Sequence, residues 1–206
     1  MEAPKVVVFD LGKVLLDFDF SIFARDLARN ARVDAEEVLN LVVQSDVLIE
    51  YETGRTTSAE FYRQVSELTG YSGDAASFEQ CFGNIFTELP EMIATQQELK
   101  SAGIPTYIFS NTNEIAIKVI RDLYPFFGGF DAYVYSYQEQ SMKPDSKIYE
   151  VVEKITGHRG SDLVFIDDKP ENIEQARQRE WHGIVHRDAG ITRAELRQLG
   201  LPLGLG

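Results

Sequence analysis

Carboxylates follow two apolar stretches of this chain, at points where strands are predicted to end. The stretch Val6–Phe9 is rich in β-branched residues and has no helical period, so we interpret it as a strand buried on both faces, and Asp10 follows it. Residues 163–166 form a second such stretch, followed by Asp167 and Asp168. Ligands bind at the carboxyl ends of parallel strands. If the two strands are neighbours, three carboxylates converge on a hard-cation site that suits Mg²⁺ better than zinc.

Three further polar residues stand where they could contact an anion. Ser110 and Asn111 end another apolar run with a hydroxyl and an amide, donors that suit a phosphoryl oxygen. They could equally cap the helix that follows, and helix starts also favour anions. Lys143 precedes Pro144, which holds its backbone extended just before a helix. It is either a solvated surface lysine or an ammonium that neutralises a bound anion.

Helices and strands alternate from Pro90 onward, which is typical of a parallel sheet with helices on both faces. We expect strands at 105–109, 132–135, 163–166 and 183–186, and helices at 91–102, 113–124, 146–156 and 171–180. Thr192 and Glu195 form a capping box, which predicts that a short final helix starts there.

Residues 17–88 have a helical texture, and no strand is predicted in them. We expect helices at 20–31, 34–51, 58–69 and about 75–87. Tyr51, Glu52 and Arg55 lie near the end of the second of these, where they could reach a substrate, although a solvated turn is the simpler expectation. This segment is most simply a helical insertion after the first strand.

Composition restricts the classes of partner. The chain has 206 residues, 44% of them hydrophobic, and a formal net charge of −13, which argues against nucleic-acid binding because a phosphate backbone needs a basic face. No apolar run approaches about 18 residues and the start lacks signal-peptide features, so we expect a soluble, cytoplasmic protein without a membrane partner. Cys81 is expected in the core. His158, His182 and His186 lack the spacing of a zinc site or a triad and are expected at the surface or a sheet edge.

Four motifs, in order along the chain, resemble those of the haloacid dehalogenase-like phosphohydrolase superfamily. They are Asp10-Leu11-Gly12, Ser110-Asn111, Lys143-Pro144-Asp145 and Asp167-Asp168. The resemblance covers nearly the whole chain and is strongest to small bacterial sugar-phosphate phosphatases and to the amino-terminal phosphatase domain of soluble epoxide hydrolases. It implies a doubly wound, Rossmann-like α/β core of residues 1–16 and 89–206. A helical cap of residues 17–88 would be inserted after the first strand and would decide which substrates fit.

The resemblance also implies an activity. This is the Mg²⁺-dependent hydrolysis of a small phosphate monoester, such as a sugar phosphate, through an aspartyl-phosphate on Asp10. The substrate would be a small phosphorylated metabolite. By the same resemblance, Lys143 would act with Asp10 in catalysis, and the substrate phosphate would be bound by Ser110, Asn111 and Lys143.

The expected metal site has four protein residues. Mg²⁺ would be held by Asp10, the Gly12 carbonyl, Asp167 and Asp168. The residues alone do not order the two adjacent aspartates, although the alignment with the family favours Asp168 as the direct ligand. Asn172 is expected to support Asp168.

Gly12 departs from the usual pattern, because most phosphatases of this superfamily carry an aspartate there as general acid and base. Such a group contributes about 10²- to 10⁴-fold in rate. In one explanation the leaving group needs little protonation, as in a sugar 1-phosphate, or water or a cap residue supplies the proton. In a second, the protein is a catalytically weak phosphate- or partner-binding relative. The similar bacterial members also carry glycine there and are regarded as phosphatases, which favours the first explanation.

A third explanation is a 2-haloacid dehalogenase, but a halide-displacing site needs no metal and gains nothing from Asp167 and Asp168. Lys13 is a further departure, since those bacterial members usually have asparagine at this position. It either adds positive charge near the phosphate or points into solvent.

Overall fold

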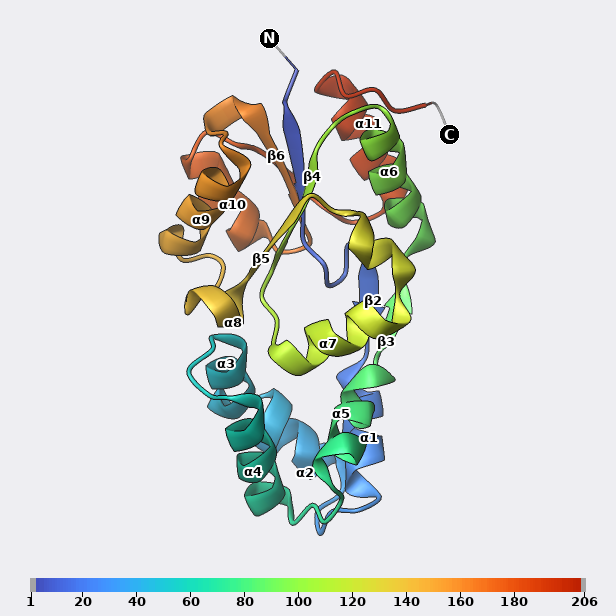
Figure 1. Cartoon of the computed structure of the whole chain (residues 1–206), viewed down its shortest axis with the longest axis vertical. Helices are drawn as coiled ribbons and strands as arrows, with labels where there is room; N and C mark the ends of the chain where they lie inside the picture. Colours follow the sequence, from blue (N-terminus) through green and yellow to red (C-terminus); the bar gives the residue numbers. More distant parts are fainter. Residues whose placement is uncertain (1–2, 205–206) are drawn as a thin grey trace.

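A five-stranded parallel sheet organises the larger part of the molecule, which a computed structural model describes for residues 3–204 (Figure 1). The spatial order is β5-β4-β1-β6-β7. The strands are β1 (Val6–Phe9), β4 (Thr106–Ser110), β5 (Ala132–Tyr135), β6 (Leu163–Asp167) and β7 (His182–Val185). The predicted parallel α/β sheet is confirmed, and β1 lies at its centre between β4 and β6.

Helices cover both faces of this sheet (Figure 1). Side chains of β1 point to opposite faces of the sheet in turn, as expected for a strand. Val7 and Phe9 join one apolar cluster, whereas Val6 and Val8 join another, and all four are buried. The first cluster includes residues of α6 (Pro90–Ser101), α7 (Glu114–Leu123) and α11 (Ala189–Gln198); the second includes residues of α9 (Ser146–Thr156) and α10 (Pro170–Gln178).

The remaining short elements of this part are α8 (Ser136–Glu139) and two 3₁₀ helices, η2 (Pro125–Gly129) and η3 (Gly160–Asp162).

The helical part has a core of its own and lies beyond the carboxyl ends of the strands (Figure 1). Its elements are α1 (Phe20–Ala28), α2 (Ala35–Val38), the π-helical turn η1 (Leu39–Val43), α3 (Asp46–Glu52), α4 (Ser58–Thr69) and α5 (Ala75–Gly83). Aromatic side chains fill the centre: Tyr51 stacks on Phe61 with ring centroids 4.2 Å apart, and Phe78 packs edge-on against Phe61. Ile115 of α7 joins the same cluster and so ties the two parts together.

A two-stranded antiparallel ribbon carries the chain into and out of the helical part, so the prediction that residues 17–88 contain no strand was wrong. β2 (Leu16–Phe18) pairs with β3 (Phe86–Glu88), and Asp17 lies opposite Thr87. Each strand has only three residues, and the partners are far apart in sequence. Neither strand is long enough to show an alternating pattern, which is why the sequence did not indicate them.

Several helix boundaries also differ from the predictions: α1 ends at Ala28 rather than residue 31, and α5 ends at Gly83 rather than about residue 87. The helix expected over 34–51 is divided into α2, η1 and α3, because the Ser45 hydroxyl donates to the Leu41 carbonyl and accepts from the Val47 N–H, which starts a new helix. The last helix begins at Ala189 with Asp188 as its cap, not at Thr192. Within residues 3–204, no helix combines the length and the apolar character that crossing a bilayer requires.

Candidate active site

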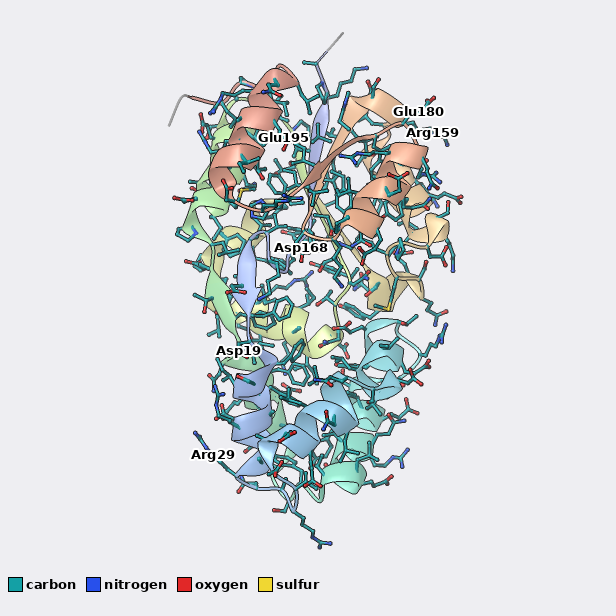
Figure 2. The ribbon with its side chains drawn as sticks, turned by 180° about the vertical axis from the view of Figure 1, so that it is seen from behind. Asp19, Arg29, Arg159, Asp168, Glu180 and Glu195 are labelled. Atoms are coloured by element: carbon teal, nitrogen blue, oxygen red, sulfur yellow. The ribbon has the colours of Figure 1, made fainter. Side chains whose placement is uncertain are left out.

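Three carboxylates meet at the carboxyl edge of the sheet. β1 and β6 pair in a register that puts Phe9 beside Ile166, and the Asp10 N–H donates to the Ile166 carbonyl at 2.8 Å. Asp10, Asp167 and Asp168 each offer an oxygen atom, and these atoms lie within 4.8 Å of one another. Figure 2 shows Asp168 near the middle of the molecule, between the sheet and the helical part.

Lys143 lies among these carboxylates. Its Nζ is 2.9 Å from Asp10 Oδ1 and 2.7 Å from Asp167 Oδ2, and it donates to the Phe109 carbonyl at 2.9 Å. The side chain is 1% exposed. Burial alone would lower the pKa of Lys143, but the charges of Asp10 and Asp167 outweigh it and raise that pKa above the usual value. The structure therefore holds a buried ammonium and excludes the solvated surface lysine.

Asn111 holds the backbone of Lys143 in place. Its Oδ1 accepts from the Lys143 N–H at 2.8 Å, and its Nδ2 donates to the Lys143 carbonyl at 3.0 Å. Ser110 is buried at the end of β4, and its hydroxyl lies 3.4 Å from the Asn111 carbonyl. The side-chain amide of Asn111 is thus engaged with Lys143, while Ser110 has no strong partner of its own.

The three carboxylates differ in how many hydrogen-bond donors contact them. Asp167 is fully buried and accepts from the Lys169 N–H, from Lys143 and, with both oxygens, from Asn172 at 3.0 Å. The prediction that Asn172 supports Asp168 was therefore wrong: it supports Asp167. Because Asp167 is saturated with donors, Asp168 is the better placed of the two to bind a ligand directly.

The site carries more negative than positive charge. Burial raises the pKa of Asp10 to about 7, against the opposing effect of Lys143, and Asp167 adds to the rise. Burial and the Asp167 charge also raise the pKa of Asp168. Three ionised carboxylates beside one ammonium carry a net charge of −2, and their oxygen atoms are the ligands that hard divalent cations prefer. The donor set therefore fits Mg²⁺.

The loop after Asp10 is shaped by Gly12 and Phe18. A Cβ on Gly12 would lie 2.8 Å from Phe18 Cε1, closer than real contacts allow, so the ring occupies the space that a side chain at this position would need. Lys13 pairs with Asp17 and donates to the Phe18 carbonyl at 3.0 Å. Its ammonium is directed to the β2 ribbon, and the structure gives it no contact with the three carboxylates.

A narrow cavity of about 70 Å³ opens beside this loop, between the sheet and the helical part. Its wall is mostly apolar, with polar groups from Gly12, Glu52 and the segment 110–113. The lining residues are Leu11, Gly12, Leu16, Phe18, Phe20, Glu52, Phe82, Ile85, Phe86, Ser110, Asn111, Thr112, Asn113, Ala116 and Ile120.

The solvated turn expected after α3 is found at Arg55, which is exposed and pairs with Glu50 at 2.8 Å, but not at Tyr51 and Glu52. Tyr51 is 2% exposed, and its hydroxyl accepts from the Ile115 N–H at 3.1 Å. Glu52 is partly buried on the cavity wall, and burial raises the pKa of its carboxyl to about 7, with Lys169 opposing the rise. The sequence marked Glu52 as able to reach a substrate but favoured a solvated turn, because the only signal was a charged residue near the end of an amphipathic helix.

The sequence predicted Cys81 in the core and His186 at the surface or a sheet edge. Cys81 is buried, as predicted. His186 directly follows β7, an edge strand of the sheet, as predicted, but its side chain is buried at 9% exposure. Its N–H donates to the Asp167 carbonyl at 2.8 Å, and its Nδ1 lies 2.8 Å from the Thr192 hydroxyl.

Comparison with known proteins agrees with this architecture. The sequence model of the haloacid dehalogenase-like hydrolase family matches residues 4–178. A sesquiterpene phosphatase of Aspergillus oryzae is 27% identical over 95% of this chain and 96% of its own length. A D-ribitol-5-phosphate phosphatase of Bacteroides thetaiotaomicron is 24% identical over 93% of this chain and 96% of its own. These relatives bear out the prediction of a phosphatase of this family.

Solved structures share the fold. A predicted HAD-like hydrolase of Porphyromonas gingivalis superposes with a TM-score of 0.79 at 23% identity, covering 94% of this chain and 98% of the other. A HAD family enzyme of Bacteroides thetaiotaomicron, in complex with magnesium and inorganic phosphate, has a TM-score of 0.78 at 22% identity, covering 89% and 94%. The predicted fold class is confirmed.

Proposed function

This chain belongs to the haloacid dehalogenase-like hydrolase family, and we propose that it is a Mg²⁺-dependent phosphatase that forms an aspartyl-phosphate on Asp10. The observation that carries the proposal is the buried Lys143 ammonium, which lies within 2.9 Å of Asp10 and 2.7 Å of Asp167, with Asp168 beside them. Positive charge in that position neutralises a phosphoryl group and limits its repulsion from an attacking carboxylate.

The proposed metal ligands are Asp10, the Gly12 carbonyl, Asp167 and Asp168. Asp168 is the favoured direct carboxylate, because Asp167 is already saturated by Lys143, Asn172 and the Lys169 N–H. When bound, Mg²⁺ supplies neutralising charge to the site and to the substrate phosphate. The complex of the HAD family enzyme of Bacteroides thetaiotaomicron with magnesium and inorganic phosphate supports this assignment.

The proposed roles in catalysis follow from the contacts. A carboxylate oxygen of Asp10 attacks phosphorus, and Lys143 keeps that carboxylate ionised by holding its Oδ1. Lys143 and the Ser110 hydroxyl bind phosphoryl oxygens. Asn111 binds them through its backbone N–H, because its side chain holds the backbone of Lys143.

The helical part, residues 17–88, is proposed to be the cap that selects substrates, on a core of residues 1–16 and 89–206. Phe18, Phe20, Phe82 and Phe86 from this part form much of the cavity wall. Such a wall favours a phosphate monoester of a largely apolar alcohol, because it offers few partners for several hydroxyl groups. The name of the Aspergillus relative, a sesquiterpene phosphatase, supports this substrate class.

A polar sugar or polyol phosphate is the second candidate. It is supported by the name of the Bacteroides relative, a D-ribitol-5-phosphate phosphatase, and by the polar segment 110–113 at one end of the cavity. The cavity of about 70 Å³ is small beside ordinary ligand pockets of roughly 300–1,000 Å³, so a bulky leaving group of either kind requires the phenylalanine wall to move.

The deciding experiment is phosphate release from 3-methylbutyl phosphate, ribitol 5-phosphate, glucose 1-phosphate and p-nitrophenyl phosphate, with Mg²⁺ and with EDTA. We expect turnover that requires Mg²⁺, is lost in Asp10→Asn, and is faster for the alkyl ester than for the two polar esters. Turnover only of the polar esters would reverse the order of the two substrate classes. Absence of turnover on all four substrates would favour a phosphate- or partner-binding role. Release of halide from 2-chloropropionate, in a separate assay, would favour a dehalogenase.

A further inference from the structure

We propose that Glu52 is the general acid and base of this site, in the role that Gly12 cannot fill. The inference rests on the proposed phosphatase function and concerns how that reaction moves its proton. The cavity wall that contains Gly12, Ser110 and Asn111 also contains Glu52, which is its one carboxylic acid among the lining residues.

In the part of the chain that the structure describes, the Glu52 carboxyl makes no structural contact that would explain its burial. Within residues 3–204 it has neither a hydrogen-bond donor nor an ion-pair partner, although unpaired carboxyl groups are costly to bury. The other residues of the wall, from the loop after β1, from β2, α1, α5, β3 and α7 and from the segment 110–113, are uncharged. Lys169, just before α10, is the charged group whose field reaches it. A carboxyl group that is buried without a hydrogen-bond or ion-pair partner exchanges a proton near neutral pH, which general acid and base catalysis requires.

The backbone of Glu52 is fixed to the sheet part rather than carried on a free loop. The Ser136 hydroxyl lies 2.6 Å from the Glu52 carbonyl oxygen and accepts from the Thr112 N–H at 2.9 Å. Gly54 has φ +73°, and a Cβ there would lie 1.9 Å from the Tyr137 carbonyl oxygen, so only glycine allows this close approach. The end of α3 is therefore docked on α8, and Glu52 is positioned before substrate arrives.

The proton balance closes within this site. As Asp10 attacks, the bond from phosphorus to the ester oxygen breaks, the electron pair stays on that oxygen, and the Glu52 carboxyl protonates it to give the alcohol. The Glu52 carboxylate then takes a proton from the water that attacks the phosphorus of the aspartyl-phosphate. Inorganic phosphate leaves, Asp10 returns as a carboxylate, and Glu52 is protonated again.

The test compares two leaving groups in Glu52→Gln. An alkoxide needs a proton as it leaves, whereas p-nitrophenolate is a stable anion, and kcat/KM reports only steps up to the departure of the leaving group. We expect kcat/KM to fall about 10²- to 10³-fold for 3-methylbutyl phosphate and less than about fivefold for p-nitrophenyl phosphate. The wild-type decline of kcat/KM above neutral pH should vanish in the variant, and Glu52→Asp should restore part of the alkyl activity.

Glu50→Gln, a change at a partly exposed position on the same helix, is the matched control and should leave both values unchanged. An equal loss on both substrates would mean that Glu52 only shapes the cavity, and no loss on either would mean that it is a bystander; either result overturns the inference while the phosphatase stands. Failure of the wild type on both substrates would instead overturn the proposed function, and this inference with it.

A measurement without turnover checks the same residue. The ¹³C resonance of the Glu52 carboxyl, assigned by its absence from Glu52→Gln, should titrate near neutral pH. The variant should also gain thermal stability relative to wild type as the pH rises from about 4.5 to 7, because the carboxyl is then ionised more readily in the unfolded chain. Titration near 4.5 would overturn the proposal.

Discussion

Lys143 Nζ lies 2.7 Å from Asp167 Oδ2, and the two side chains are 1% and 0% exposed. This pair joins the loop before α9 to the end of β6 and leaves the ammonium free to contact Asp10 as well. Charges buried to this extent are stable only together, because each alone would lack both water and a counter-charge.

Lys143→Met should therefore damage both activity and stability. Removal of the ammonium leaves Asp10 and Asp167 buried beside each other, which should lower the free energy of unfolding by about 3–5 kcal/mol in metal-free buffer. Urea denaturation in EDTA measures this loss. Lys147→Met, at an exposed position nearby, is the control, and a loss below about 1 kcal/mol in Lys143→Met would contradict the role of the ammonium in the fold.

Magnesium should stabilise the wild-type protein even without substrate. A ligand at 100 times its Kd adds about 2.7 kcal/mol to the free energy of unfolding, so the melting temperature should rise with Mg²⁺ and return to its starting value in EDTA. Asp168→Asn should lose most of this response, whereas Asp122→Asn on the exposed face of α7 should keep it. An undiminished response in Asp168→Asn would argue against Asp168 as a ligand.

Gly12→Ala should be destabilising because of Phe18 alone. The new Cβ would lie 2.8 Å from Phe18 Cε1, and overpacking of this kind costs about 1–3 kcal/mol. In a Phe18→Ala background the same change should cost less than about 0.5 kcal/mol, since the ring is gone. A double-mutant cycle by chemical denaturation gives both values, and additive effects would show that the ring is not the obstacle.

Arg179 and Glu153 should make stability depend on pH. Burial would raise the pKa of Glu153, but hydrogen bonds from Arg179, at 3.0 and 2.7 Å, and from Trp181 outweigh it and hold that pKa below the usual value. The stability that this pair contributes is therefore complete above about pH 4.5 and is lost as the pH falls through the lower folded pKa.

Arg179→Met removes that contribution. We expect it to lower the free energy of unfolding by about 3 kcal/mol at pH 7, with a smaller loss at pH 3, where Glu153 is protonated in the unfolded chain and partly protonated in the folded one. Arg63→Met, which breaks an exposed pair with Glu67, should change it by less than about 0.5 kcal/mol at either pH. Equal losses for Arg179→Met at both pH values would contradict the pairing.

The sequence by itself determined the parallel sheet and the meeting of its charged residues. Apolar runs such as Val6–Phe9, with helices between them, permit few other arrangements, and parallel strands bring their carboxyl ends to one edge. Asp10 and Asp167 therefore had to be near neighbours once β1 and β6 paired. The ribbon of β2 and β3 was missed because its two short strands are stabilised only by pairing across a long stretch of sequence.

Tertiary structure alone decided which side chain donates a hydrogen bond to which carboxylate. Asn172 supports Asp167 rather than Asp168, and this depends on the direction in which α10 leaves the sheet. The burial of Glu52 could not be predicted either, because a helical sequence pattern is the same for a solvated glutamate and for a desolvated one. Its place on the cavity wall follows from Gly54 and Ser136, a close approach between segments far apart in the chain. Local sequence sets which backbone a residue adopts, whereas burial and charge partners come from the packing of distant segments.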